Sequence, residues 1–167
     1  MEPIEIVNLT PDRLEEALAV FKVSDWDEDS LFYVKAEMQA FLKGDINGYI
    51  RAHFIVAIVD KRIIGVAAWA PSMCSFWLYE LSWATVLPEW RHRGINSLML
   101  TERLRQIRAH HGSEVFSVMV CTWDNPMYTQ NGFVPMEPQG RRSLDKKGKC
   151  LLLAQFGLAT KTPPVHW

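Results

Sequence analysis

A strand, a helix and a second strand in succession between residues 76 and 121 constrain the fold more than any other feature of the sequence. Phe76 to Val86 is an apolar, aromatic-rich run ended by Pro88, and Val115 to Cys121 is a second strand-like run. Between them, Ser97 to His110 places leucine and isoleucine at helical spacing and stops at Gly112. Because strands joined through a helix favour a right-handed parallel crossover, we predict a β-α-β unit.

Hairpin signals surround this unit. Asp60-Lys61-Arg62 separates two β-branched runs, which predicts antiparallel neighbours. The remaining predicted elements are strands at 4–9, 133–136 and 150–156, and helices that begin at Thr10-Pro11, at Ser30 and at Pro126. We therefore expect an α/β fold with a mixed, mostly antiparallel sheet around a central β-α-β crossover flanked by helices. Without a repeat or linker, residues 1–167 form one domain with a core at about 4–156.

The composition excludes several classes. No apolar stretch reaches the ~18 residues of a membrane span, and the first residues do not have the pattern of a signal peptide. Three cysteines give no disulfide framework or zinc site, and adjacent His110-His111 lacks helical i, i+4 ligand spacing, so we expect no metal and a solvated helix end. A cytoplasmic location is the expectation.

Charge is divided unevenly along the chain. Residues 1–45 carry eleven acidic against four basic side chains, and residues 46–167 carry eight against fourteen. This division indicates an anionic ligand on the C-terminal part and a cationic one near the N-terminal part. Two unrelated solvated faces are the alternative.

The turn from Val86 to Asn96 carries the most chemistry. It links the strand to the helix, where backbone N–H groups at the helix start lack partners and attract anions. Arg91 and Arg93 add charge, and Gly94 lets the backbone approach a ligand. The turn predicts a pyrophosphate cradle, and an ordinary helix start with solvated arginines is the alternative.

This turn resembles the acetyl-CoA signature of GNAT N-acetyltransferases, Arg-x-x-Gly-x-(Gly/Ala). The chain has Arg91-His92-Arg93-Gly94-Ile95-Asn96, so Asn96 stands where the family has a small residue and either shifts the pyrophosphate or forms the helix N-cap. The resemblance implies a GNAT fold, acetyl-CoA bound by these six residues as co-substrate, and acetyl transfer to an amine.

A second segment also resembles the family. Asn125, Tyr128 and Gly132-Phe133 match its Asn…Tyr-x-x-x-Gly-Phe element, with Asn125 closer to the tyrosine than usual, which predicts a short helix. The resemblance implies that Asn125 contacts acetyl-CoA and that the Tyr128 hydroxyl protonates the leaving thiolate. A core tyrosine bonded to a backbone group is the alternative.

The strand before the turn carries a third candidate. Glu80 is the only carboxylate between Asp60 and Glu89, and Ser82 lies on the same face. Because free amines are mostly protonated at neutral pH, Glu80 is a candidate general base and Ser82 a polar substitute. A carboxylate paired with a neighbouring arginine is the alternative.

The resemblance implies the remaining mechanism. The strand end at Thr85 and Val86 splays from its neighbour and holds the pantetheine arm, and the Val86 N–H polarises the thioester carbonyl. The amine attacks directly through a tetrahedral intermediate, so Cys121 is a strand residue rather than a nucleophile.

The acceptor is expected at the acidic loop between the first two helices. Asp25, Trp26, Asp27 and Asp29 favour a cationic amine, on a small molecule or peptide, near an aromatic ring. Two alternatives stay open: a GNAT-like module that binds CoA with little catalysis, and an enzyme that acetylates aminoacyl-tRNA. The second would use basic side chains at 103, 105, 108 and 141–149. No membrane partner is expected, and a homodimer is a further open partnership.

Overall fold

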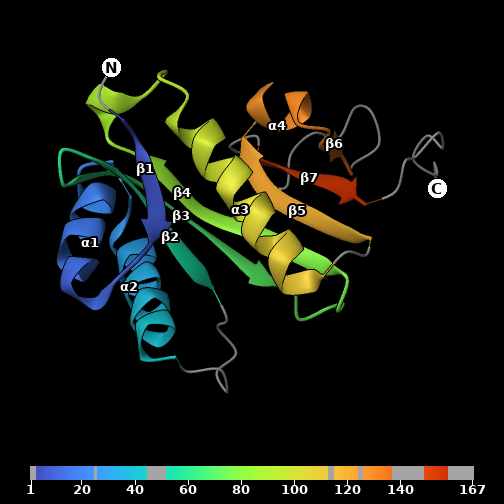
Figure 1. Ribbon diagram of the computed structural model, residues 1–167, viewed down its shortest axis with the longest axis horizontal. Helices are drawn as coiled ribbons and strands as arrows, with labels where there is room; N and C mark the ends of the chain where they lie inside the picture. Colours follow the sequence, from blue (N-terminus) through green and yellow to red (C-terminus); the bar gives the residue numbers. More distant parts are fainter. Residues whose placement is uncertain are drawn as a thin grey trace.

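The computed structural model describes residues 3–24, 26–44, 52–112, 115–123, 126–136 and 149–157. Its strands form a seven-stranded sheet in the order β1-β2-β3-β4-β5-β7-β6 (Figure 1). Every neighbouring pair is antiparallel except β4 and β5. The predicted α/β fold, with a mixed and mostly antiparallel sheet, is therefore confirmed.

The elements follow the predicted order. They are β1 (Glu5–Asn8), η1 (Pro11–Arg13), α1 (Leu14–Lys22), α2 (Glu28–Lys43), β2 (His53–Val59), β3 (Arg62–Pro71), β4 (Leu78–Val86), η2 (Pro88–Trp90), α3 (Ile95–His111), β5 (Phe116–Trp123), α4 (Pro126–Gln130), β6 (Val134–Pro135) and β7 (Lys149–Phe156). The helix α3 is the crossover between the parallel strands β4 and β5.

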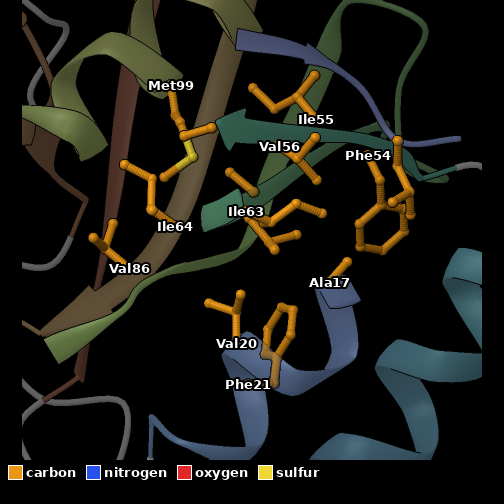
Figure 2. Packing of buried hydrophobic residues seen from close by; sticks show 14 of the residues in the cluster. Ala17, Val20, Phe21, Phe54, Ile55, Val56, Ile63, Ile64, Val86 and Met99 are labelled. Carbon is orange, nitrogen blue, oxygen red and sulfur yellow. The ribbon is translucent and has the colours of Figure 1, made fainter. Parts of the chain in front are cut away.

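Helices cover the sheet from both sides. A Cβ added to Gly65 of β3 would lie 3.2 Å from Cε of Met99, so α3 packs closely on that face. Figure 2 shows Met99 on one side of the strands and Ala17, Val20 and Phe21 of α1 on the other. The helices α1 and α2 lie side by side, as Figure 1 shows. The two faces beside β4 are therefore distinct chemical environments.

Turn and cap residues explain where several elements begin. Asp60 and Lys61 both have positive φ, 47° and 66°, as the two-residue turn of a tight hairpin requires. The side chain of Asp27 accepts a 2.7 Å hydrogen bond from the Ser30 N–H and caps α2. The predicted start of α2 at Ser30 is thus wrong by two residues, because Asp27 is a cap rather than a loop residue.

The start of α3 also differs from the prediction. The helix begins at Ile95, not Ser97, and its N-cap is Gly94 with φ 77°. Asn96 is the second residue of the helix, so it is not the N-cap. A left-handed φ at the cap suits glycine, which has no Cβ to clash.

Arg103 lies inside the core between α3 and the sheet. Its side chain is 0% exposed, and it donates from Nη1 to the Ala68 carbonyl at 3.3 Å and from Nε to the Met99 carbonyl at 3.4 Å. The other guanidinium nitrogen, Nη2, is buried without a partner among the described residues. The expectation that Arg103 could contact nucleic acid is therefore wrong.

Candidate active site

The strands β4 and β5 separate towards their carboxyl ends. Their parallel pairing begins at Leu78 opposite Ser117 and ends at Leu81 opposite Val120. β4 continues to Val86 without pairing to β5, whereas β5 stays paired with β7 as far as Trp123. The predicted splay is present, and it leaves one side of the β4 backbone open for five residues.

The backbone of Val86 points into this opening. The Leu87 N–H donates to the Ile64 carbonyl of β3 at 2.9 Å. Because successive strand residues direct their backbone groups to opposite sides, the Val86 N–H points away from β3. The Val86 carbonyl accepts a 3.1 Å hydrogen bond from Nε of Arg91. Thr85, the residue before Val86, is buried opposite Val66.

The start of α3 lies at the same end of the sheet. The first helical hydrogen bond runs from the Leu98 N–H to the Gly94 carbonyl, so the amides of Ile95, Asn96 and Ser97 precede it. Gly94 has no side chain with which to cap these amides, and, apart from its two chain neighbours, no described residue has an atom within 4 Å of where its Cβ would stand. Such an uncapped start with open space in front of it attracts anions.

The basic side chains of the turn differ in their roles. The guanidinium of Arg93 lies over the ring of Trp90, 4.9 Å from its centroid. Arg91 is exposed and uses Nε for the Val86 carbonyl, and its other nitrogens form no hydrogen bond among the described residues. His92 is exposed and has a left-handed φ of 61°. Two guanidinium groups and a helix dipole therefore place positive charge beside the splay.

Tyr128 lies in the five-residue helix α4, which is as short as predicted. Its side chain is only 3% exposed, and its ring packs edge-on against Phe133 at 5.4 Å between centroids. Its hydroxyl has no hydrogen-bond partner among the described residues, so the backbone partner of the alternative interpretation is not found there. Because α4 follows β5, it begins at the same end of the sheet as the splay. Asn125 lies outside the described residues.

Glu80 and Ser82 share the face of the sheet that α1 and α2 cover. Glu80 pairs with Ala70 and Ser82 with Ala68, two positions apart on both strands, which confirms their common face. Within the part of the chain that the structure describes, no arginine pairs with Glu80. Cys121 lies in β5, as predicted.

A bulge in β4 follows directly after Ser82. Val66 pairs with Thr85 but Ala68 pairs with Ser82, so β4 carries one extra residue there. Trp83 in this bulge has φ 53°, a strained conformation for a large side chain that costs about 1–3 kcal/mol. Such strain persists only where the surroundings hold it in place.

Three contacts hold Trp83. Its Nε1 donates to Oε2 of Glu37 on α2 at 2.7 Å, and its ring packs against Phe21 and Trp26 with centroids 6.2 and 5.6 Å away. Burial raises the pKa of the Glu37 carboxyl, and the hydrogen bond from Trp83 opposes this rise. Sequence reasoning missed Glu37, because nothing local marks a contact between residues 46 positions apart.

The predicted acidic loop is shorter than expected. Asp25 lies outside the described residues, Trp26 packs against Trp83, Asp27 caps α2 and Asp29 is exposed in its first turn. Of the residues predicted to bind the acceptor amine, Trp26 is the one whose side chain packs directly against a β4 residue, Trp83.

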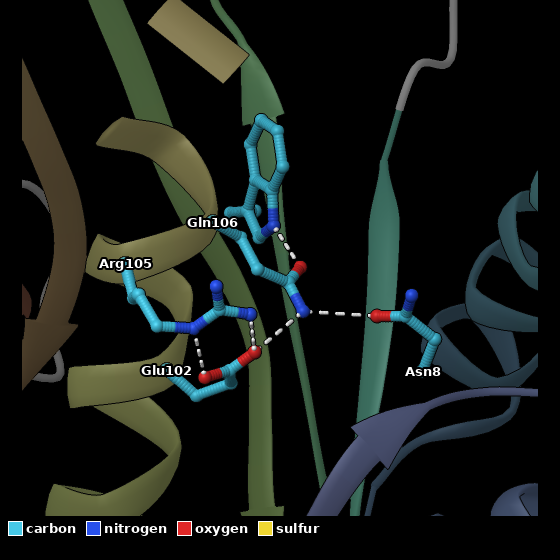
Figure 3. A network of polar contacts seen from close by, with 5 residues as sticks. Asn8, Glu102, Arg105 and Gln106 are labelled. Atoms are coloured by element: carbon cyan, nitrogen blue, oxygen red, sulfur yellow. Dashed lines mark hydrogen bonds and ion pairs between the residues drawn. The ribbon is translucent and has the colours of Figure 1, made fainter. Parts of the chain in front are cut away.

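Two further expectations about α3 need correction. His111 is half-buried rather than solvated, and its Nδ1 lies 2.9 Å from the Tyr79 hydroxyl, because aromatic side chains surround this end of the helix. Arg105 is exposed but binds Glu102 through two 2.7 Å hydrogen bonds, beside the Gln106 network that reaches Asn8 (Figure 3). Of the basic side chains on α3 that were predicted to bind nucleic acid, Arg103 is buried and Arg105 is paired with Glu102.

The comparisons with known proteins agree with this geometry. A family model described as an acetyltransferase (GNAT) domain matches residues 51–135. The chain belongs to the GNAT acetyltransferase family. Among curated proteins, none matches this GNAT chain significantly. None of the described helices is both long and apolar enough to cross a membrane.

Solved structures resemble this GNAT domain at low sequence identity. A GNAT-family putative acetyltransferase from Desulfovibrio desulfuricans has a TM-score of 0.70 at 16% identity, over 92% of this chain and 98% of that one. The PaiA N-acetyltransferase of Thermoplasma acidophilum, in complex with coenzyme A, has a TM-score of 0.67 at 17% identity, over 92% of this chain and 99% of that one. A GNAT acetyltransferase of Brucella melitensis, in complex with acetyl-CoA, has a TM-score of 0.61 at 18% identity, over 91% of this chain and 89% of that one. These similarities establish the fold.

Proposed function

We propose that this protein transfers an acetyl group from acetyl-CoA to a primary amine. One observation carries the proposal: β4 parts from β5 after Leu81, beside the uncapped start of α3. An extended thioester can lie in the opening while its pyrophosphate meets the helix amides. Two solved structures with this fold hold coenzyme A or acetyl-CoA. We also propose the cytoplasm as its location, as the sequence predicts.

The donor side uses the turn before α3. The amides of Ile95 and Asn96, with the charges of Arg91 and Arg93, bind the pyrophosphate, and His92 and Asn125 add contacts. The fit is supported by the buried Oδ1 of Asn96, which has no partner among the described residues and can accept a ligand's hydrogen bond.

The strand end orients the reacting carbonyl. The pantetheine arm lies along Val86, whose N–H points away from β3 and donates to the thioester oxygen, and Thr85 flanks the arm while its own backbone groups face β3. One such donor contributes ~3 kcal/mol in comparable sites. Tyr128 gives its hydroxyl proton to the leaving thiolate, since that hydroxyl has no other partner among the described residues.

The acceptor side is the opposite face of the sheet. The amine approaches beside Trp26, Asp27 and Asp29, and Glu80 takes its proton with Ser82 nearby. A small molecule or a peptide can supply this amine, and direct attack needs no covalent enzyme intermediate.

A module that binds CoA without catalysis is the second candidate, favoured by the large Asn96 in the cradle. Labelled acetyl-CoA incubated with polyamines, lysine peptides and aminoacyl-tRNA, read by mass spectrometry, separates the two. An acetylated amine supports the enzyme. CoA binding by calorimetry without any product supports the module, and acetylation of aminoacyl-tRNA alone supports the RNA-directed alternative.

A further inference from the structure

A carboxylate that sequence analysis did not single out lies beside the opening of the sheet. Glu37 belongs to α2, and its Oε2 accepts the 2.7 Å hydrogen bond from the Trp83 indole. Trp83 follows Leu81, the last β4 residue paired with β5, by two positions and precedes Val86 by three. The contact therefore holds Glu37 at the stretch of β4 that forms the opening.

One oxygen of the Glu37 carboxylate is available to a ligand, because it is not among the buried side-chain atoms without a partner. Oε1 has no hydrogen-bond donor among the described residues, and no lysine or arginine of those residues forms an ion pair with Glu37. A half-buried carboxylate without a cation is unfavourable, and this burial raises its pKa. Such a group gains most from an incoming positive charge.

Aromatic rings surround this carboxylate. Phe21, Trp26 and Trp83 contact one another, with the two tryptophan centroids 5.6 Å apart. Indole faces attract cations and pack against alkyl stems. Charge, spare acceptor and rings together suit an alkylammonium group rather than a neutral arylamine.

We propose that Glu37 binds the ammonium group of the acceptor and thereby selects cationic alkylamines, with Trp83 as the positioning residue that holds it. This inference rests on the proposed acetyl transfer. Glu37 acts before the proton leaves: it holds the R–NH₃⁺ form beside the opening. Glu80 then takes one proton, and the neutral nitrogen bonds to the acetyl carbon to give the tetrahedral intermediate, whose collapse breaks the C–S bond. The second nitrogen proton goes to solvent, and Tyr128 protonates the sulfur.

The test compares three variants on the best alkylamine acceptor of the panel above, at saturating acetyl-CoA. Glu37→Gln keeps the shape and the acceptor atom for Trp83 but removes the charge. Trp83→Phe keeps a ring but releases Glu37. Glu15→Gln, on the neighbouring helix α1 with a 74% exposed side chain, is the matched control for charge alone.

We expect the acceptor KM to rise about tenfold in Glu37→Gln and severalfold in Trp83→Phe, with kcat and the KM of acetyl-CoA within twofold of wild type. Glu15→Gln should leave all constants unchanged. An equal rise in Glu15→Gln, or an unchanged acceptor KM in folded Glu37→Gln, overturns the inference. If wild type acetylates no amine, the proposed function falls first and this inference falls with it. A variant that fails to fold is replaced by Glu37→Asp, which must raise the same KM by shortening the side chain.

Discussion

Filling the space in front of α3 is the most direct perturbation of the donor site. Gly94→Trp places an indole in open space, since only the two chain neighbours of Gly94 among the described residues can lie within 4 Å of the added Cβ. The indole blocks the ligand's approach to the amides of Ile95 and Asn96. Hydrogen bonds to a charged group contribute about 1.5–3 kcal/mol each. Losing two costs about 3–6 kcal/mol, so the Kd for CoA should rise at least about 100-fold.

The matched control separates this block from backbone strain. Any side chain at residue 94 adopts a φ of 77°, at a cost of about 1 kcal/mol. Gly94→Ala carries the same strain without the bulk, so it should lose a few degrees in Tm and bind CoA within about threefold of wild type. Isothermal titration calorimetry and thermal unfolding measure both quantities. A folded Gly94→Trp protein with wild-type affinity for CoA would refute the assignment of this turn.

Four further predictions concern one or two side chains each. Tyr128→Phe removes only the proton donor, so kcat should fall about 100-fold while the Kd for CoA persists, and a loss below threefold would identify a structural tyrosine. Asp27→Asn with Asp29→Asn keeps the cap of α2 but removes two charges, so the acceptor KM should rise, more at low salt. Unchanged constants would make these residues a solvated helix start. Glu80→Gln should be slow near neutral pH and recover at high pH, where the amine is already neutral, and pH profiles parallel to wild type would remove Glu80 from the mechanism. Burial raises the pKa of Glu37 in the folded protein above its value in the unfolded chain. The protonated side chain therefore adds to the free energy of unfolding below the ordinary carboxyl pKa, and this contribution is lost as pH rises through the pKa of the folded state. The Tm of Glu37→Gln relative to that of wild type should therefore rise between acid and neutral pH. A Tm difference that does not change with pH would contradict the raised pKa.

Local patterns were sufficient to predict most of the architecture. The turn at Asp60-Lys61 and the stop at Gly44 depend on neighbouring residues alone, and both are found where expected. The splay of β4 came from the family resemblance, and the pairing that ends at Leu81 confirms it. The cap at Asp27 was missed because its bond to Ser30 is indistinguishable, in sequence, from an acidic loop.

Long-range contacts set the limit of prediction. The bond between Glu37 and Trp83 joins α2 to a bulge, and neither the bulge nor its strain has a signature in an apolar run. Arg103 did carry a signal. It stands four residues after Met99 and four before Ile107, so it lies on the stripe that α3 buries, as the structure shows. Weighing charge above periodicity led to the wrong surface assignment.

The burial of Arg103 has a consequence for how α3 is seated. Its Nη1 reaches the Ala68 carbonyl of β3 only when the helix has its present rotation and height on the sheet, whereas the bond from Nε to the Met99 carbonyl lies within α3. Turning or sliding α3 would strand a cation in the core, at a cost of several kcal/mol. If the buried face of α3 were entirely apolar, the helix could pack on the sheet at other rotations or heights. The buried arginine disfavours these alternative packings. The helix start at Ile95 lies about two turns before Arg103 in the same helix. We therefore expect the buried arginine to fix the orientation of the backbone amides at this proposed anion site.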